Sequence, residues 1–514
     1  KERAMKKRVK RALICAVALV LLVFGCSFSY PSDSYSITYG NDAVLSAEAV
    51  KFGRTITGVD LGIGGFKDPM CVRCAPDGRL LIADTGNHRV VVTDSQYTVQ
   101  FVLQTFSREG REDSLKEPNG VFVTQEGEIY VADTGNQRVL VFGPDGKFRR
   151  EMPRPESALL GDNFVYQPTA LVVDTAGRMY VIARNINQGL MEFDESGRFK
   201  GFMGANKVNI DPWQVLLKRF STQEMIARME QTVPTEYNGI TIDADGFIYT
   251  TTSTLSDSVI SSVIQNRSTD ERYSPIRKLN ASGTDVLQRQ GAFMPVGDTT
   301  YVSAVIDSSK PAGPSKLRDI AVDGASFYTV LDSNRGHVFK YDNRGNLLFQ
   351  FGGLSDTNSG FVTPVSLTQL DGRYLILDFS RQCLIEFQTT EYGEKIVDAT
   401  LQYQNGRYAE SRQQWESVLT LNGNCETAYI GLGLVEYHDK NYAQAAAYFK
   451  LGQDRQNYSK AFSKYRSQVI VDHFGEIAAV LLALAGALLV LAICLRLRRK
   501  YREIVDSVMH ARRR

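Results

Sequence analysis

The clearest pattern of residues that could do chemistry is a pair of cysteines three positions apart. Cys71 and Cys74 have the spacing of a redox pair or of half a zinc site. The apolar residues around them predict a β-strand, on which residues three positions apart point to opposite faces. We therefore expect both cysteines to be small buried side chains that share no role.

Other residues suited to catalysis or metal binding are scarce. The chain has five histidines, and the two in its β-rich part, His88 and His337, fall at corners between strands. Two histidines cannot form a three-histidine zinc site, and the sequence has no nucleophile elbow, phosphate-binding loop or Ser-His-Asp pattern. Several aspartates belong to glycine turns, where such side chains accept backbone hydrogen bonds: Asp77, Asp174, Asp243 and Asp245. The sequence thus predicts no catalytic residue, no metal site and no cofactor, and a protein that is not an enzyme.

A repeated pattern of about 50 residues positions these side chains. Each copy has an apolar strand, a glycine turn, a second strand, a polar corner and a third strand, and a second turn opens a fourth strand. The copies cover residues 71–94, 120–143, 170–194, 239–254, 319–342 and 366–388. Four antiparallel strands repeated six times predict a mainly β fold, a six-bladed β-propeller.

The corner sequences IADTGNHRV and VADTGNQRV resemble NHL repeats. The resemblance covers residues 52–395 and implies an NHL-type propeller, which we expect residues 51–58 to close by completing the last blade. It also implies an alternative activity. NHL-type amidating lyases and related lactonases hold a metal in the central channel through histidines or through Glu, Asn and Asp of the inner strands.

Three positions recur at the corners of the blades. An aspartate, an asparagine and an arginine share the repeat positions of Asp84, Asn87, Arg89, Asp133, Asn136, Arg138, Asp332 and Asp378. We expect each aspartate to accept backbone N–H bonds in a tight corner, and each arginine to pair with it across blades. Copy three has Arg184 in place of the aspartate, and copy four has Thr252.

Two insertions interrupt the ring, at residues 205–235 and 253–275. The first has apolar residues at helical spacing and a capping box formed by Ser221 and Glu224. It is either a helix that lies on the ring or a docking helix for a partner or the membrane. The second alternative gives a set of partner-binding residues, namely Trp213, Leu216, Leu217, Phe220 and Arg184.

Residues 396–466 have helical spacing and resemble tetratricopeptide (TPR) repeats. The motif at Gly406 and Tyr408 returns about 34 residues later at Asn441 and Tyr442. The sequence therefore predicts a small α-helical, TPR-like module after the propeller. Such modules build surfaces for protein contacts in the family that they resemble.

Both ends of the chain combine an apolar run with basic residues. The runs cover residues 12–28 and 477–495, and the mean hydropathy of −0.20 leaves room for only a few membrane spans. We expect a basic N-terminus with a signal-anchor or transmembrane helix at 1–30, a linker at 31–51, a transmembrane helix at 467–497 and a basic cytoplasmic tail at 498–514. The first run has three open interpretations: a retained anchor, a cleaved secretory signal, or a lipoprotein signal that ends at Cys26.

The charge distribution predicts a topology. Since most of the excess Lys and Arg lies beside the two apolar runs, the propeller and the helical module are placed outside a bacterial plasma membrane, with both termini cytoplasmic if the first span is retained. The remaining part of the chain is acidic, which argues against nucleic acid as a partner.

These features favour a membrane-anchored scaffold or accessory subunit that mediates protein-protein interactions in a membrane complex. The combination of repeats resembles accessory proteins of carbohydrate ABC-type permeases, whose subunits would be the partners, together with the lipid bilayer around the terminal helices. Two alternatives stay open: an extracytoplasmic sensor of glycan or cell-wall ligands, and an NHL-type lyase or hydrolase.

Overall fold

The computed structural model describes residues 35–37, 43–160, 164–204, 236–301 and 311–511. The candidate docking residues Trp213, Leu216, Leu217 and Phe220 lie outside these ranges, as does the first apolar run. The chain divides into two compact units, residues 1–425 and residues 426–514. Each unit is described by itself.

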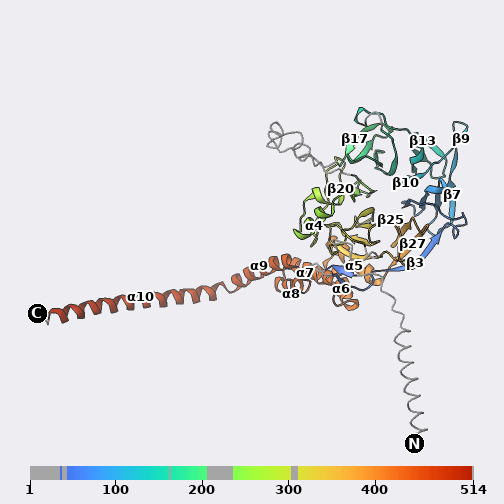
Figure 1. The fold of residues 1–514 in the computed structure, drawn as a ribbon. Coiled ribbons are helices and arrows are strands. Elements are labelled where there is room, and N and C mark those ends of the chain that lie inside the picture. Colours follow the sequence, from blue (N-terminus) through green and yellow to red (C-terminus); the bar gives the residue numbers. More distant parts are fainter. Residues whose placement is uncertain (1–34, 38–42, 161–163, 205–235, 302–310, 512–514) are drawn as a thin grey trace, which may run out of the picture. The chain divides into compact units, whose positions relative to one another are not determined.

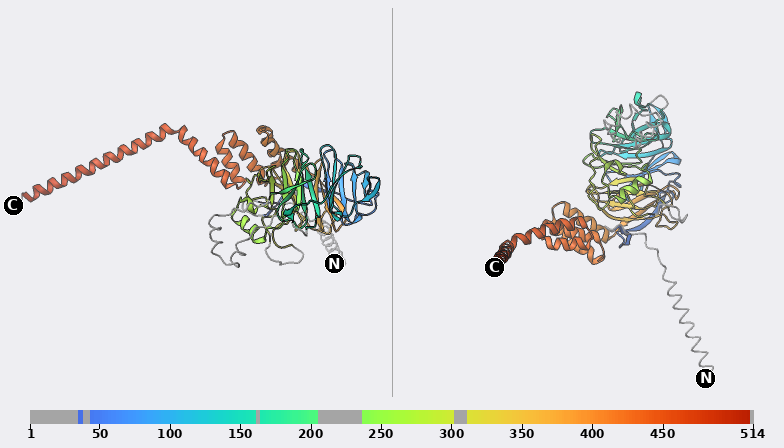
Figure 2. Two further views of the ribbon diagram at one scale, coloured as in Figure 1. Left: turned by 90° about the horizontal axis from the view of Figure 1, so that it is seen from above. Right: turned by 60° about the vertical axis from the view of Figure 1, so that its left-hand side comes forward.

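The first unit is a ring of six antiparallel sheets, and the prediction of a six-bladed propeller is confirmed (Figures 1 and 2). Blade one consists of β4 (Cys71–Cys74), β5 (Leu80–Asp84), β6 (Arg89–Thr93) and β7 (Val99–Leu103). Blade two consists of β10 (Pro118–Val123), β11 (Ile129–Asp133), β12 (Arg138–Phe142) and β13 (Phe148–Met152). Blade three consists of β14 (Pro168–Val173), β15 (Met179–Ala183), β16 (Leu190–Phe193) and β17 (Phe199–Met203).

The other three blades complete the ring. Blade four consists of β18 (Gly239–Ile242), β19 (Ile248–Thr251) and β20 (Ile276–Leu279). Blade five consists of β21 (Leu317–Val322), β22 (Tyr328–Asp332), β23 (Val338–Tyr341) and β24 (Leu347–Phe351). Blade six consists of β25 (Pro364–Leu370), β26 (Arg373–Asp378), β27 (Cys383–Thr389) and β3 (Val50–Thr57). The inner strands contact one another in the order β4, β10, β14, β18, β21 and β25, and β25 contacts β4, so the ring is closed.

The closing strand comes from the N-terminal side of the ring, as the sequence predicts. β3 pairs antiparallel with β27, and Ile56 lies opposite Leu384 in the register. The last blade therefore joins residues more than 300 positions apart in the chain. This pairing fixes the two ends of the ring to each other and leaves no open sheet edge between them.

Blade four departs from the predicted four strands, because it has three. After β20 the chain turns at Asn280 and makes a single bridge between Leu279 and Asp285. The next apolar residues, Met294 and Val296, then pack with helix α4 (Asp257–Gln265) in a separate buried cluster. Burial against this helix takes the place of a fourth strand.

The core lies between neighbouring blades. Every residue of β5, β11 and β15 is buried, as expected for strands with apolar side chains on both faces. Cys71 packs in a cluster with residues of blade two, whereas Cys74 packs against a cluster shared with blade six. The two cysteines thus point to opposite sides of their blade, as predicted for residues three positions apart on a strand.

Smaller elements surround the ring. Two short hairpins, β1 (Tyr35–Ile37) with β2 (Ala43–Leu45) and β8 (Thr105–Arg108) with β9 (Arg111–Ser114), stand outside the six sheets. Short 3-10 helices η1 (Thr85–Asn87) and η2 (Thr134–Asn136) form the corners of blades one and two. Two more, η3 (Ala158–Leu160) and η4 (Glu271–Tyr273), lie in connections.

Two helices follow the last blade within the first unit, α5 (Glu391–Gln404) and α6 (Tyr408–Leu421). The side chain of Thr390 caps α5 by accepting a hydrogen bond from the backbone N–H of Gly393. A Cβ at Gly393 would lie 2.2 Å from the carbonyl oxygen of Ala49, just before β3. Glycine at this position therefore permits the close approach of α5 to the strand that closes the ring.

The second unit is helical. It contains α7 (Glu426–His438), α8 (Tyr442–Leu451), α9 (Arg455–Asp472) and α10 (Phe474–Ala511). α8 packs against both α7 and α9, and Phe449 fills the space over Gly433. The TPR-like character of these helices stays a prediction.

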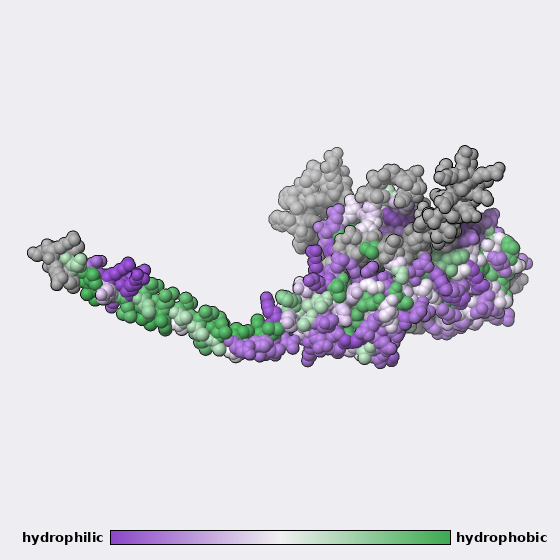
Figure 3. All heavy atoms as spheres, turned by 90° about the horizontal axis from the view of Figure 1, so that it is seen from below, coloured by the Kyte–Doolittle hydropathy of each residue, from purple (hydrophilic) through white to green (hydrophobic). Residues whose placement is uncertain are grey.

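One helix in the described part of the chain is long and apolar enough to cross a membrane. This segment, Phe474–Ser507, has a mean hydropathy of 3.0 over its most apolar window, and Figure 3 shows the apolar surface along it giving way to hydrophilic residues near the C-terminal end. A span needs about 20 apolar residues, so the length is sufficient.

Candidate functional site

The inner strands place one residue of each blade at the same height around the centre of the ring. In four inner strands the pairing register shifts by one residue near the start, which leaves a residue out of the ladder. The residues left out are Asn119, Thr169, Arg318 and Val365. Such bulges aim side chains away from strand pairing and are common beside functional sites.

Blades one and four have their equivalents in Met70 and Asn238. The backbone N–H groups of Met70 and Asn238 donate to the carbonyl oxygens of Ala83 and Thr251 at 3.1 and 2.9 Å, just before the first paired residue of each strand. These six residues together are called the inner rim below. Four members of the inner rim are polar, and none of these four is a carboxylate: Asn119, Thr169, Asn238 and Arg318.

Below the inner rim, an arginine crosses the centre of the ring. Arg73 of β4 donates to both carboxylate oxygens of Asp319 in blade five at 2.9 Å. It also reaches Ser366 Oγ of blade six at 3.0 Å and the carbonyl oxygen of Ile240 in blade four, at the limit of 3.5 Å. Burial opposes the charge of Arg73, but the facing carboxylate of Asp319 raises its pKa above the ordinary value. The pair ties blade one to blade five, with blade six between them in the ring.

Asp319 has no free oxygen for another ligand. Besides Arg73, it accepts hydrogen bonds from the Ser366 hydroxyl and from the backbone N–H groups of Leu367 and Ile320, at 2.8 to 2.9 Å. Asp319 takes the register position that Gly120 has in blade two, where a Cβ would lie 2.4 Å from the carbonyl oxygen of Thr169. Blade five accommodates a carboxylate there only because its neighbour supplies these donors.

A central metal ion, which the resemblance to NHL-type lyases and lactonases implies, does not fit these residues. Asp319 is the one carboxylate on the inner strands that the structure describes, and the guanidinium of Arg73 already pairs with it, so a second cation would be repelled. Within the described ranges, no three His, Cys, Asp or Glu side chains lie close enough together to hold a metal ion. We derive no chemistry through a metal at this site.

The corner aspartates organise the same face of the ring. Their carboxylates accept backbone N–H bonds from the residues that lead into the inner strands, at 2.7 to 2.8 Å: Asp84 from Lys67, Asp133 from Lys116, Asp332 from Lys316 and Asp378 from Val362. In blade one, Asn87 and Arg89 also donate to Asp84, at 2.9 and 2.7 Å. Each corner is therefore fastened to the start of its own inner strand.

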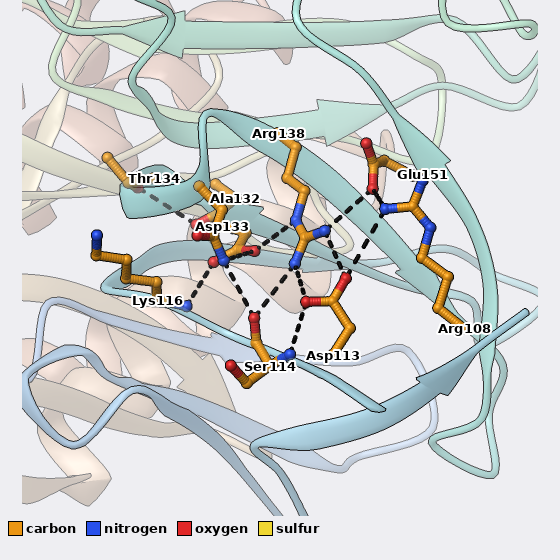
Figure 4. A network of polar contacts seen from close by, with 10 residues as sticks. Arg108, Asp113, Ser114, Lys116, Ala132, Asp133, Thr134, Arg138 and Glu151 are labelled. Carbon is orange, nitrogen blue, oxygen red and sulfur yellow. Dashed lines mark hydrogen bonds and ion pairs between the residues drawn. The ribbon is translucent and has the colours of Figure 1, made fainter. Parts of the chain in front are cut away.

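Blade two extends this corner into a network of charges, which Figure 4 shows. Asp133 accepts bonds from Asn136 and Arg138 at 2.9 and 2.8 Å, and burial raises the pKa of Asp133 in spite of these donors. Arg138 further holds Asp113 of the β8–β9 hairpin at 2.7 Å and Glu151 of β13 at 3.1 Å. The extra hairpin is thus fastened to the blade by ion pairs.

Two expectations about the corners are corrected. Arg89 and Arg138 pair with the aspartate of their own blade and not across blades, because Asp84 lies directly opposite Arg89 in the register of neighbouring strands. In blade three the aspartate position is occupied by Ala183, which lies opposite Pro168 as Asp133 lies opposite Pro118. Arg184 is the next residue and is exposed.

The cysteines are unsuited to thiolate chemistry. Burial raises the pKa of the Cys71 thiol, and it raises that of Cys74 to about 11. Neither is a reactive thiolate at neutral pH, because nucleophilic cysteines have lowered pKa values.

The arginines and the aspartate at the centre were not predicted from the sequence. Arg73 and Asp319 are 246 positions apart, and Arg318 precedes Asp319 in a copy whose corner motif is degenerate. One signal could have found them. The aligned copies have small residues or cysteine at the position of Asp319, so a carboxylate there is an exception.

Comparisons with known proteins agree with this architecture. The NHL repeat family matches residues 115–142, and no curated protein matches the sequence. A streptogramin B lyase structure matches at 11% identity with a TM-score of 0.38, covering 67% of this chain and 100% of that one. Virginiamycin B lyase from Staphylococcus aureus matches at 10% identity (TM-score 0.38, 66% and 100% covered). A gluconolactonase from Xanthomonas campestris matches at 13% identity (TM-score 0.36, 67% and 95% covered). At these values the likeness assigns no particular activity to this chain.

The prediction that the chain is not an enzyme was wrong as a deduction from the sequence, since chains named as lyases and as a gluconolactonase are among the matching structures. A propeller assembles its central residues from distant blades, as Arg73 and Asp319 illustrate, so missing contiguous motifs do not exclude catalysis. The comparisons give no support to a scaffold role beside an ABC permease. The chain is a six-bladed β-propeller that contains an NHL repeat, followed by helices of which the last is long and apolar enough to span a membrane.

Proposed function

We propose that this chain is a membrane-anchored, extracytoplasmic propeller that binds a polar ligand, such as a glycan or cell-wall fragment, at the inner rim. One observation carries the proposal: four of the six inner-rim positions are polar, and three of these are bulged out of strand pairing. Met70, Thr169, Asn238 and Arg318 are partly exposed, whereas Asn119 and Val365 are buried, so the first four are the rim residues that a ligand can reach. A ligand held there is an effector or a substrate.

The inner rim has the mixture of groups that polar ligands need. Among its partly exposed residues, Asn238 carries an amide donor and acceptor, Thr169 a hydroxyl, and Arg318 a guanidinium. Met70 adds partly exposed apolar surface. Ligand sites of proteins combine apolar walls with a few convergent polar groups in this way. Complexes with membrane proteins such as ABC permease subunits stay a prediction from the sequence.

A bulky side chain on the inner rim is expected to block the ligand. Replacing Thr169 with Trp should weaken binding of a muramidase digest of peptidoglycan by about tenfold or more, because the indole fills space over the rim. The full chain in nanodiscs is incubated with the digest, and bound and altered fragments are identified by mass spectrometry. This readout detects both recognition and turnover.

Thr175→Trp is the matched control. Thr169 lies near the start of β14, whereas Thr175 is exposed in the turn after β14. The two residues are therefore at opposite ends of this strand. Equal losses in both variants, or equal binding in both and in the unmodified chain, would remove the inner rim from consideration.

The extracytoplasmic placement has its own test. A cysteine at Thr175 should react with a membrane-impermeant maleimide in intact cells, whereas one at Ser507 near the end of α10 should react only after lysis. The basic residues after the apolar part of α10 are the reason, because such residues are retained in the cytoplasm. The reverse pattern of labelling contradicts the proposed topology.

A further inference from the structure

Arg318 differs from Arg73, Arg89 and Arg138 because no described carboxylate pairs with it. It lies between Leu317 and Asp319 at the bulge of β21. Its Nε donates to the carbonyl oxygen of Val365 at 3.2 Å, so the side chain extends from blade five to blade six along the inner rim. This contact uses one of the five N–H groups of the guanidinium.

No carboxylate of the described residues lies within 4.0 Å of the Arg318 guanidinium. The adjacent Asp319 is engaged by Arg73. By contrast, Arg73, Arg89 and Arg138 each have a carboxylate oxygen at 2.7 to 2.9 Å. Arg318 is half-buried, and this burial lowers its pKa, which is the direction expected for a cation without a counter-ion.

The surroundings of Arg318 favour an added negative charge. Its neighbours on the inner rim are Asn238 and Val365, and Asn119 stands on the opposite blade, so the rim holds no acidic group. A half-buried charge is costly unless it is paired. Since no carboxylate of the described residues pairs with Arg318, an anion from outside would gain a charge-assisted bond and would reduce that cost.

We propose that Arg318 receives an oxyanion, a carboxylate or phosphate group, of the ligand that binds at the inner rim. The planar fork of the guanidinium presents its two terminal nitrogens to paired oxygens of such a group. Thr169 and Asn238, which are partly exposed, then contact the neutral polar part of the ligand. This inference rests on the proposed function and narrows it to anionic ligands.

The test compares two anionic probes with a neutral one on the full chain in nanodiscs. Glucuronate and inorganic phosphate are the anions, and glucuronamide is the neutral analogue of glucuronate. Binding is measured by calorimetry and by the shift of the unfolding temperature at constant ionic strength. We expect one of the two anions to bind about 10- to 100-fold more weakly to Arg318→Gln than to the unmodified chain, since a charged hydrogen bond is lost. Preference for glucuronate indicates a carboxylate ligand, and preference for phosphate indicates a phosphorylated one.

Two further variants separate charge from folding. Arg318→Lys should keep part of the affinity, and Arg272→Gln, which removes an exposed arginine paired with Asp270, should keep all of it. The oxyanion site is overturned if neither anion binds, or if Arg318→Gln binds the preferred anion as well as the unmodified chain does. It is also overturned if phosphate does not bind and glucuronate binds no better than glucuronamide. The peptidoglycan digest tested with Thr169→Trp decides the proposed function independently, because a neutral fragment can still bind at the rim.

Discussion

Replacing Asp319 with alanine is expected to destabilise the propeller by about 3–5 kcal/mol, the cost of leaving a buried charge without its partner. Asp319 is 4% exposed, and its loss strands the guanidinium of Arg73 at the centre of the ring. The backbone N–H of Leu367 loses its acceptor as well. The loss would appear as a lower denaturation midpoint of the full chain, followed by the circular dichroism of the strands.

A double variant distinguishes the effect of an unpaired charge from the effect of lost side-chain packing. Arg73→Met combined with Asp319→Leu removes both charges and keeps apolar volume, so much of the stability should return. Arg272→Ala breaks an exposed pair with Asp270 and should leave the midpoint unchanged. A midpoint of Asp319→Ala equal to that of the unmodified chain would show that the central pair does not hold the blades together.

The ring itself could be predicted because its cause is local and repeated. Each copy has its own turns and alternating strands, so the six copies indicate the same blade six times. The closing strand could also be predicted, since the last copy lacks a strand and residues 51–58 have the alternation to supply it. The prediction of a fourth strand failed for blade four, because the residues after β20 pack against α4 instead, which is a tertiary effect.

The centre of the ring could not be predicted in the same way. Arg73 and Asp319 meet only because six inner strands converge, and nothing near either residue in the sequence indicates the other. The error at Arg184 has a different origin. The copies were aligned on a polar corner residue, whereas the pairing register shows that Ala183 has the aspartate's position, with Arg184 one residue beyond. A shift of one residue changes which side chain faces the corner.

The ring closure contains a buried carboxylate that makes stability depend on pH. Glu386 of β27 lies opposite Arg54 of the closing strand, accepts a hydrogen bond from Tyr97 of blade one, and receives Arg373 at 3.3 Å. The guanidinium of Arg54 lies 4.6 Å from the centre of the Tyr97 ring. These contacts join blade six to blade one, at the place where the closing strand β3 completes the ring.

Replacing Glu386 with Gln should lower the stability of the ring by about 1–3 kcal/mol at neutral pH, the value of hydrogen bonds to a charged group. Burial alone would raise the pKa of Glu386, but the hydrogen bonds from Tyr97 and Gln388 and the charges of Arg54 and Arg373 outweigh it, and the net pKa is lowered from 4.5. A lowered carboxyl pKa contributes stability that is complete above the ordinary value and is lost as the pH falls through the folded value. The unmodified chain should therefore lose this contribution below pH 4.5, whereas Glu386→Gln has none to lose.

The measurement is the urea midpoint of both chains at pH 7 and at a pH well below 4.5, where the difference between them should shrink. Glu394→Gln is the matched control, because Glu394 is exposed on α5 and its charge should not matter at either pH. A difference between Glu386→Gln and the unmodified chain that stays constant on acidification would mean that the side chain acts through its shape. In that case the pairing of β3 with β27 would hold the end of the ring in place, and the negative charge of Glu386 would not contribute.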